Sequence, residues 1–156
     1  MLAMLMMSMT PMAATSLSAK AASMKIVKVN VQGGRLREGP SAEYDVITTL
    51  KRDQKIFYSG KTKNAFSYVC TADGKKGFIY RGFLSNYGTI RTEQVYYTTG
   101  RNVRMYKKAS TSAGRAATLR QQQYVIVYKK SGSWAYVRTL DGTAGFIPLK
   151  HLHKAG

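Results

Sequence analysis

Few side chains in this sequence could carry out catalysis. Its 156 residues include one cysteine, Cys70, and two histidines, His151 and His153, which lie close to the C-terminus. A cysteine nucleophile needs a nearby base to raise its thiolate fraction, and the half of the chain that contains Cys70 has no histidine. A single cysteine also excludes an internal disulfide bond and a zinc site built on several cysteines.

The acidic residues and the histidines are also poorly placed for chemistry. Only 7 residues are Asp or Glu, and glycosidases need two carboxylates that face each other across a cleft. Glu38, Glu43 and Asp45 lie in one loop region, but the related stretch later in the chain has no acid. His151 and His153 would point to opposite faces of a strand, which makes them a poor metal pair. We therefore expect a protein that is not an enzyme and has no metal or cofactor.

A duplicated segment indicates the elements around which the chain is organised. Residues 68–79 and 136–147 are identical at eight of twelve positions, at an offset of 68. Each copy has an Asp-Gly pair, Asp73-Gly74 or Asp141-Gly142, between two apolar segments. This pattern predicts a β-hairpin with a type I′ turn, in which both central residues have φ > 0. A duplicated hairpin indicates a tandem repeat.

Other positions of the duplicated segment lead to further expectations. Gly77 and Gly145 open the return strands, where a missing side chain lets another backbone come close. Cys70 aligns with Arg138, and a position that accepts Arg is expected at or near the surface. We expect four apolar residues of the hairpins in the core: Val69, Phe78, Val137 and Phe146.

The flanking sequence extends each hairpin into a complete repeat. Short segments rich in β-branched and aromatic residues alternate with polar turns, and no segment has the period of an amphipathic helix over ten or more residues. We expect an all-β protein with a first domain at residues 25–85, a polar linker at 86–94 and a second domain at 95–153.

The two repeats align with offsets between 67 and 69, which confines insertions to loops. In this alignment Val103 matches Leu36 and Arg104 matches Arg37. The segment Met105–Lys108 then lengthens a loop of the second repeat, and loops of this kind often have a functional role.

The first residues resemble a secretory leader. The run from Met1 to about Leu17 is apolar and too short to span a bilayer, and the pattern Ala19-x-Ala21 that follows is typical of a cleavage point. We expect a signal peptide at residues 1–21 and a secreted, extracellular protein that is associated with the cell wall. A leader normally begins with positive charge, and none precedes this apolar run, so we expect translation to start upstream of Met1.

Charge and aromatic residues provide the main functional signal. The chain has 25 Lys and Arg against 7 Asp and Glu, a formal net charge of +18, which favours an anionic partner or surface. Aromatic rings flanked by cations suit sugars and extended peptides, although the same residues could simply cap the folded domains or form a solvated face. The candidate groove residues are Arg37, Tyr44, Tyr58, Phe66, Tyr80, Arg104, Tyr106, Lys107, Lys108, Tyr128 and Trp134.

The order of motifs in both repeats resembles the bacterial SH3 domain. In the second repeat the resemblance rests on Asn102-Val103-Arg104, Ala109–Ser112, Leu119, Val125, Val127, Trp134, Tyr136-Val137, Gly145-Phe146-Ile147 and Leu152. In the first it rests on Leu36-Arg37, Gly39-Pro40-Ser41, Leu50, Phe66, Tyr68-Val69, Gly77-Phe78-Ile79 and Leu84. It departs from the family at Phe66, where the family prefers Trp, and in the loop at 105–108. The resemblance implies two small, partly open SH3-like barrels of five to six strands each, which act as binding modules.

Three functions of different classes are compatible with these observations. The first is a secreted, non-enzymatic protein whose two modules bind cell-wall material, either peptidoglycan or an anionic wall polymer. The second is an extracellular adaptor that binds a peptide or protein. The third is nonspecific binding of polyanions such as nucleic acid. The expected signal peptide argues against this function, because an exported protein seldom meets nucleic acid. We favour the first, because two linked weak sites bind a repeating polymer far better than one.

Overall fold

The computed structural model describes residues 23–155, so the leader expected at residues 1–21 lies outside the described residues. This part of the chain consists of strands and three short 3₁₀ helices, and none of its helices could cross a membrane. The first half contains β1 (Ser23–Val29), β2 (Gly34–Arg37), β3 (Val46–Leu50), β4 (Lys55–Lys63), β5 (Phe66–Cys70), β6 (Lys76–Tyr80), η1 (Arg81–Phe83) and β7 (Leu84–Arg91). After η2 (Thr92–Gln94), the second half contains β8 (Val95–Thr98), β9 (Val103–Tyr106), β10 (Arg115–Leu119), β11 (Tyr124–Ser131), β12 (Trp134–Thr139), β13 (Ala144–Pro148), η3 (Leu149–His151) and β14 (Leu152–Lys154).

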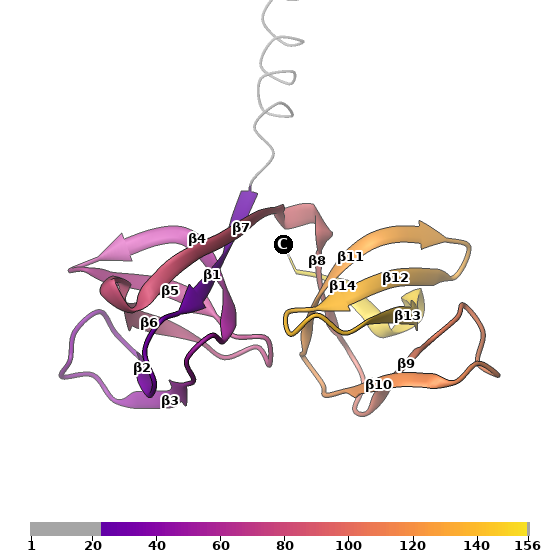
Figure 1. Ribbon diagram of the computed structural model, residues 1–156, viewed down its shortest axis with the longest axis horizontal. Helices are drawn as coiled ribbons and strands as arrows, with labels where there is room; N and C mark the ends of the chain where they lie inside the picture. The colour runs from indigo at the N-terminus through magenta and orange to yellow at the C-terminus, as the bar shows by residue number, and fades with distance from the viewer. Residues whose placement is uncertain (1–22, 156) are drawn as a thin grey trace, which may run out of the picture.

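Each half forms one antiparallel sheet that curls around its own core (Figure 1). The strand order is β3-β2-β6-β5-β4-β1-β7 in the first sheet and β10-β9-β13-β12-β11-β8-β14 in the second, so the two sheets have the same topology. We call the curled sheets the first barrel, β1–β7, and the second barrel, β8–β14. The all-β fold with two consecutive small domains is therefore confirmed.

Each sheet has 7 strands, more than the five or six expected, because the last segment of each repeat pairs with its first strand. In the first barrel β7 lies along β1, from Leu84 opposite Val29 to Arg91 opposite Ser23. Residues 86–94, expected to form a polar linker, instead continue β7 as far as Arg91 and then form η2. Burial of Ile90, which is 7% exposed, anchors this segment to the sheet.

The duplicated hairpins are β5–β6 and β12–β13, and their turns differ from the expected type. Only the glycines have positive φ, 88° at Gly74 and 100° at Gly142. The Thr71 amide donates to the Lys75 carbonyl at 2.8 Å, and Thr139 makes the equivalent bond in the second barrel. Each loop therefore has three residues and ends on a left-handed glycine, another common hairpin geometry. The Thr71 hydroxyl closes this longer loop by accepting from the Lys75 amide at 2.9 Å, so the type I′ prediction is wrong.

Strand pairing corrects the alignment of the two repeats. Gly34 pairs with Leu50 in the first barrel and Val103 pairs with Leu119 in the second, which relates these strands by an offset of 69. From β5 and β12 onward the offset is 68, because β11 has 8 residues where β4 has 9. The offset of 67 used for this region in the sequence alignment is wrong.

The corrected offset changes which residues are equivalent. Met105 occupies the place of Leu36, and both side chains are 0% exposed. Tyr106, rather than Arg104, takes the place of Arg37. The sequence alignment followed the shared apolar-Arg motif, whereas the fold follows the alternation of buried and exposed residues along the strand. Met105 and Tyr106 thus belong to a strand and do not lengthen a loop.

Each barrel encloses its own apolar core, formed by alternate residues of its strands. Val69 and Val137 are buried as expected, at 1% and 0% exposure. Phe78 and Phe146 are only half-buried, and each ring packs against a tyrosine of the neighbouring strand with centroids 5.0 and 5.1 Å apart. The isoleucine that follows each Phe points inward and is 0% exposed. The core prediction for the two phenylalanines is wrong because two adjacent strand residues face opposite sides.

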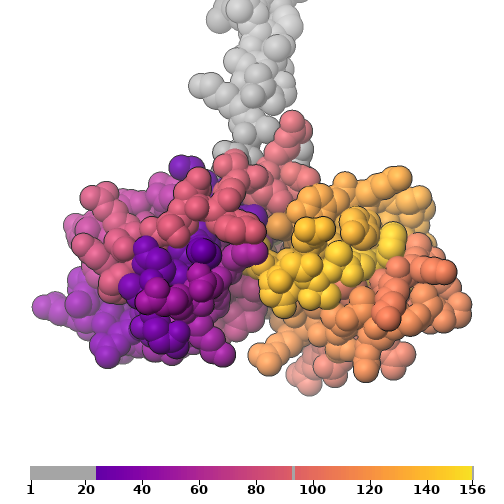
Figure 2. All heavy atoms as spheres, viewed as in Figure 1, coloured from indigo at the N-terminus to yellow at the C-terminus, as the bar shows by residue number. Residues whose placement is uncertain are grey.

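The two barrels pack against each other through equivalent faces (Figures 1 and 2). An offset of 69 relates Phe57 to Ile126 and Ile26 to Val95, so both barrels contribute the same positions to the contact. An interface that uses one surface twice has the form of an isologous contact between identical subunits. The buried residues of this interface cluster are Phe57, Ile90, Val95, Ile126 and Leu140.

Cys70 lies at the edge of this interface cluster rather than at the free surface. It is partly buried, and its thiol donates to the Thr71 carbonyl at 3.4 Å. The neighbouring chain segment crosses to the second barrel, where the Tyr124 amide donates to the Ala72 carbonyl at 2.6 Å. The sequence alignment with Arg138 predicted that Cys70 would be exposed, because Arg138 is its equivalent in the second barrel and is itself exposed. The two positions differ because the symmetry of the interface is only approximate.

Candidate binding grooves

A groove of about 470 Å³ opens on the first barrel. Its aromatic wall consists of Phe66 at the start of β5, Tyr80 at the end of β6 and Phe83 in η1, with successive ring centroids 5.9 and 5.2 Å apart in edge-on geometry. Arg35 and Arg37 line it from β2, because side chains alternate along this strand and Leu36 between them points into the core. This first groove is lined by Gly33, Arg35, Arg37, Ala42, Phe66, Tyr80 and Phe83.

The loop after β2 holds the Arg37 guanidinium in place. Its Nη1 donates to the Tyr44 carbonyl at 2.8 Å. The Tyr44 ring folds back over Gly39, where an added Cβ would lie 2.5 Å from ring carbons, so the loop depends on that glycine. A guanidinium has five N–H donors, and the remaining ones are available to an anionic group in the groove.

The duplicated hairpin positions the strand from which these groove residues project. A Cβ at Gly77 would lie 2.5 Å from the Arg37 carbonyl oxygen, and one at Gly145 would lie 2.7 Å from the Tyr106 carbonyl oxygen. Both distances are far below ordinary carbon–oxygen contact, so only glycine permits this approach. The expected role of Gly77 and Gly145 is confirmed, and it fixes the residue at the end of β2 or β9.

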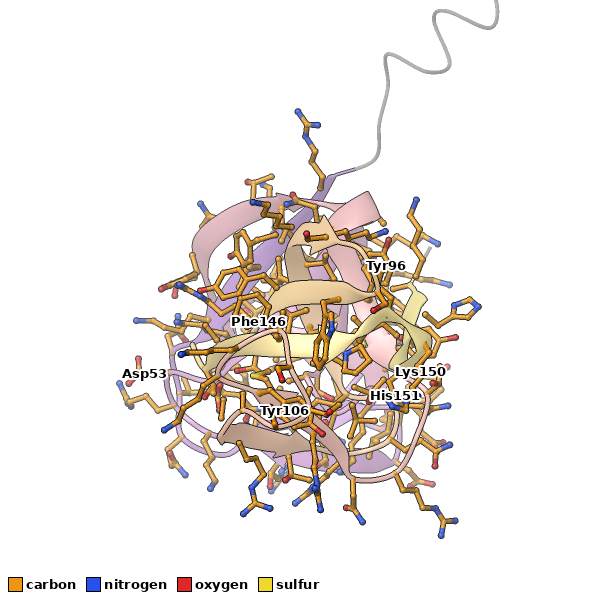
Figure 3. The ribbon with its side chains drawn as sticks, turned by 90° about the vertical axis from the view of Figure 1, so that its right-hand side faces the viewer. Asp53, Tyr96, Tyr106, Phe146, Lys150 and His151 are labelled. Carbon is orange, nitrogen blue, oxygen red and sulfur yellow. The ribbon has the colours of Figure 1, made fainter. Side chains whose placement is uncertain are left out.

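A larger groove, of about 700 Å³, opens on the second barrel. Tyr106 from β9 and Trp134 from β12 meet edge to face, with ring centroids 5.7 Å apart and an interplanar angle of 85°. Figure 3 faces this barrel and labels Tyr106, Lys150 and His151 around the groove. This second groove is lined by Gly100, Arg101, Asn102, Val103, Arg104, Tyr106, Thr111, Ser133, Trp134, Pro148, Leu149, Lys150 and His151.

The two grooves are the same feature built twice. With the corrected offsets, every residue that lines the first groove has its equivalent in the lining of the second. Both linings contain aromatic rings and cations, and neither contains an acidic residue. The loops that border them, between β2 and β3 and between β9 and β10, lie at opposite ends of the long axis (Figure 1). The equivalent second-groove residues are Asn102, Arg104, Tyr106, Thr111, Trp134, Pro148 and His151.

The structure brings together six of the eleven residues that the sequence indicated. Arg37, Phe66 and Tyr80 line the first groove, and Arg104, Tyr106 and Trp134 line the second. The other five do not line either groove. Tyr44 holds Arg37 through its backbone, Tyr58 binds Thr62 on another face, and Tyr128 lies in a separate basic groove, while Lys107 and Lys108 are exposed in the loop after β9.

Several lining residues were not indicated by the sequence. Arg35, Phe83 and His151 enter the grooves from β2, η1 and η3. The pair Arg35–Arg104 becomes visible only with the corrected offset of 69, whereas the pair Phe83–His151 already follows from the offset of 68 that relates the two hairpins. The change from Phe83 to His151 replaces an apolar ring with a titratable one.

Two further reactive groups, the Cys70 thiol and the His153 imidazole, lie outside the first and second grooves. Burial raises the pKa of the Cys70 thiol to about 11, outweighing the opposite effect of the Lys76 ammonium. A thiol with this pKa is protonated at neutral pH and therefore a weak nucleophile. His153 stacks on Tyr97 with centroids 5.3 Å apart. Among the side chains that the structure describes, no group of three His, Cys, Asp or Glu could hold a metal ion.

Comparison with a protein-family model supports the fold. A family model described as bacterial SH3 domain matches residues 32–85 and 100–153, together more than half of the chain. Among solved structures, NlpC2 and NlpC1 from Trichomonas vaginalis share 12% and 13% identity with this chain, each with a TM-score of 0.34. The matches cover 83% of this chain but only 48% and 45% of those structures, so this chain spans about half their length. No curated protein sequence matches the chain.

Proposed function

The chain belongs to the bacterial SH3 domain family, whose members commonly act in binding, and from that premise we propose that it is an exported, non-enzymatic protein that binds cell-wall material. Its ligand is peptidoglycan or an anionic wall polymer, held in the first and second grooves. The observation that supports this function best is the duplication of one groove at equivalent positions of both barrels. A chain that builds the same concave site twice is suited to a ligand that also repeats.

The groove chemistry suits a polymer with both sugar rings and carboxylates. Ring faces such as those of Tyr80, which is 44% exposed, offer an apolar surface with a polar tip. Arg35 and Arg37 in the first groove, and Arg104 in the second, supply planar guanidinium groups that bind carboxylates in a bidentate manner. Peptidoglycan presents both kinds of group along one strand.

The interface between the barrels strengthens this proposal. The interface cluster and the bond from Tyr124 to Ala72 hold the two barrels together, so the two grooves keep a defined separation. A second binding event on the same polymer then occurs at high effective concentration, which raises the overall affinity well above that of one groove.

A sedimentation assay with purified wall sacculi at physiological salt tests this function. Phe66→Ala and Trp134→Ala each remove the equivalent ring from one groove, and each is expected to weaken binding about tenfold, as for an aromatic anchor. The double variant is expected to lose nearly all binding. Tyr87→Ala removes a 55% exposed ring outside both grooves and serves as the matched control. Recovery of all wild-type protein in the supernatant, or equal losses in the three single variants, would contradict the proposal.

The alternative function is an extracellular adaptor for peptides or proteins. It is favoured by the wider second groove, in which Trp134 and Tyr106 form the kind of aromatic wall that receives extended peptides. An adaptor would crosslink to a partner protein and would not bind sacculi. The sedimentation assay therefore distinguishes the two functions.

A further inference from the structure

A third groove, of about 450 Å³, lies on the second barrel away from the two aromatic grooves. It runs over β8, β11 and β14, and Arg91 of β7 and Gln94 of η2 also line it. It shares no lining residue with the second groove. Figure 3 shows its residue Tyr96 on the upper part of the barrel, whereas Tyr106 of the second groove lies lower. We call it the basic groove; its lining is Arg91, Gln94, Tyr96, Val127, Tyr128, Lys129, Lys130 and Lys154.

The basic groove concentrates positive charge. Four of its described lining residues are Lys or Arg, and no described lining residue is acidic. Its three lysines, Lys129, Lys130 and Lys154, take no part in the two ion pairs found among the described side chains, Lys28 with Asp53 and Lys75 with Asp73. Like charges that gather in one concave surface repel one another, and a bound anion relieves this repulsion. The groove is therefore suited to an anionic ligand.

Each aromatic ring of the basic groove lies close to a cationic side chain of the protein itself. The Lys130 ammonium hydrogen-bonds the Tyr96 hydroxyl and lies 4.6 Å from the centre of the same ring. The Arg138 guanidinium lies 5.8 Å from the centre of the Tyr128 ring. Tyr96 is also buried, at 9% exposure. Tyr128 is 53% exposed, so the groove offers a ligand one open aromatic ring beside four cations.

The equivalent face of the first barrel shows that the fold does not require these cations. That face has a smaller groove, of about 240 Å³, which includes Tyr58, Thr62 and Asn86. Strand pairing makes Thr62 the equivalent of Lys130 and Asn86 the equivalent of Lys154. Thr62 binds the Tyr58 hydroxyl at 2.9 Å, so a neutral contact occupies the place of an ammonium. The groove on the first barrel still has two cations in its lining, Lys25 and Arg81, so the basic groove differs from it by the additional ammonium groups of Lys130 and Lys154.

We propose that the basic groove binds the phosphate groups of a linear phosphodiester polymer of the cell wall. Lysine ammonium groups bind phosphate as point charges and tolerate variable geometry, which suits a flexible chain with repeated phosphates. Nucleic acid carries the same phosphates but gains affinity by stacking successive bases on free aromatic faces. Of the two aromatic rings in this lining, Tyr96 is buried and only Tyr128 is open to solvent, so the groove does not offer a series of stacking faces. This inference rests on the proposed function in one respect, namely that the phosphodiester polymer belongs to the cell wall.

The test uses a short poly(glycerol phosphate) as the probe and full-length protein. Lys129→Gln with Lys154→Gln removes two exposed ammonium groups from the basic groove, and Lys61→Gln with Lys63→Gln removes two exposed ones from β4 of the first barrel. Both double variants lose the same net charge. The basic-groove variant is expected to bind the probe at least about tenfold more weakly and to reduce the salt dependence by roughly two phosphate contacts. The control variant is expected to retain wild-type affinity.

Two comparisons make the outcome decisive. Equal losses in both double variants would mean attraction by net charge alone and would overturn the site. Tighter binding of a single-stranded DNA of equal charge than of the polymer would overturn the choice of ligand. Sacculi stripped of phosphate polymer report on the aromatic grooves separately: we expect Trp134→Ala to weaken that binding and the basic-groove variant to leave it unchanged. Binding to stripped sacculi without binding to the probe would refute this inference and leave the proposed function standing.

Discussion

The close approach at Gly145 leads to the sharpest prediction about this fold. An added methyl group would lie 2.5 Å from Met105 Cγ and 2.7 Å from the Tyr106 carbonyl oxygen. The methionine side chain can move, but the carbonyl belongs to β9, which faces β13 at this point. Gly145→Ala must therefore push β9 away from β13, and with it the Tyr106 ring from Trp134.

The expected cost follows from this overlap. Overpacking a filled core costs about 1–3 kcal/mol, and for a small domain this lowers Tm by roughly 5–20 °C. Differential scanning calorimetry measures the change, and affinity for sacculi reports on the displaced ring, which we expect to weaken second-groove binding.

Gly88→Ala is the matched control. Gly88 lies in β7, and an added Cβ there would meet nothing within 4 Å, so we expect its Tm to stay within about 2 °C of wild type, as for a neutral surface change. If Gly145→Ala melted with the control and bound sacculi normally, the glycine would not be what fixes β9, and the account of the groove would be wrong.

Three further predictions concern the interface and the titrating groups. Leu140→Ala, which removes a side chain with 4% exposure from the interface cluster, is expected to cost about 2–4 kcal/mol and to split the calorimetric transition into two; a single unshifted transition would show that the barrels do not support each other. The Cys70 thiol is expected to react slowly with iodoacetamide at pH 8 and faster as pH approaches about 11. Because folding raises the pKa of this thiol from 9.0, its contribution to stability is fully present below pH 9 and is lost as pH rises through the folded pKa. Cys70→Ala should remove this alkaline loss of stability. The hydrogen bond that the Thr139 hydroxyl donates to Asp141 lowers the pKa of that carboxyl from 3.8, so its contribution to stability is present above that value and lost as pH falls through the lower folded pKa. Asp141→Asn should flatten this acid loss in melting curves between pH 2 and 5, and an unchanged slope would mean that the turn does not depend on the carboxylate.

The candidate sites illustrate the limits of sequence reasoning. The residue types were predictable, since Arg37, Phe66, Tyr80, Arg104, Tyr106 and Trp134 all line the two aromatic grooves. Which residues of the two grooves are equivalent could not be predicted. Motif similarity matched Arg104 to Arg37, whereas strand pairing matches Tyr106 to Arg37. The two-residue difference matters because alternation along a strand decides which side chains face the groove.

The interface had no signal in the sequence. Cys70 and Arg138 occupy equivalent positions, and only one of them packs against the other barrel. Similarly, the apolar residues Ile90 of β7 and Val95 of β8 look like ordinary strand residues, but both are buried in the cluster between the barrels. Contacts of this kind join residues that are far apart in the chain, so no local pattern reports them.

The sequence by itself determined the all-β fold, the tandem repeat and the two hairpins, because alternation of apolar residues and glycine-containing turns act over a few neighbouring residues. Only the tertiary structure decided the alignment of β2 with β9, the rings that share each groove, the cations that meet in the basic groove and the burial of Cys70. Each of these depends on which strands pair and which faces are covered, and burial follows from the assembled sheets rather than from any single segment.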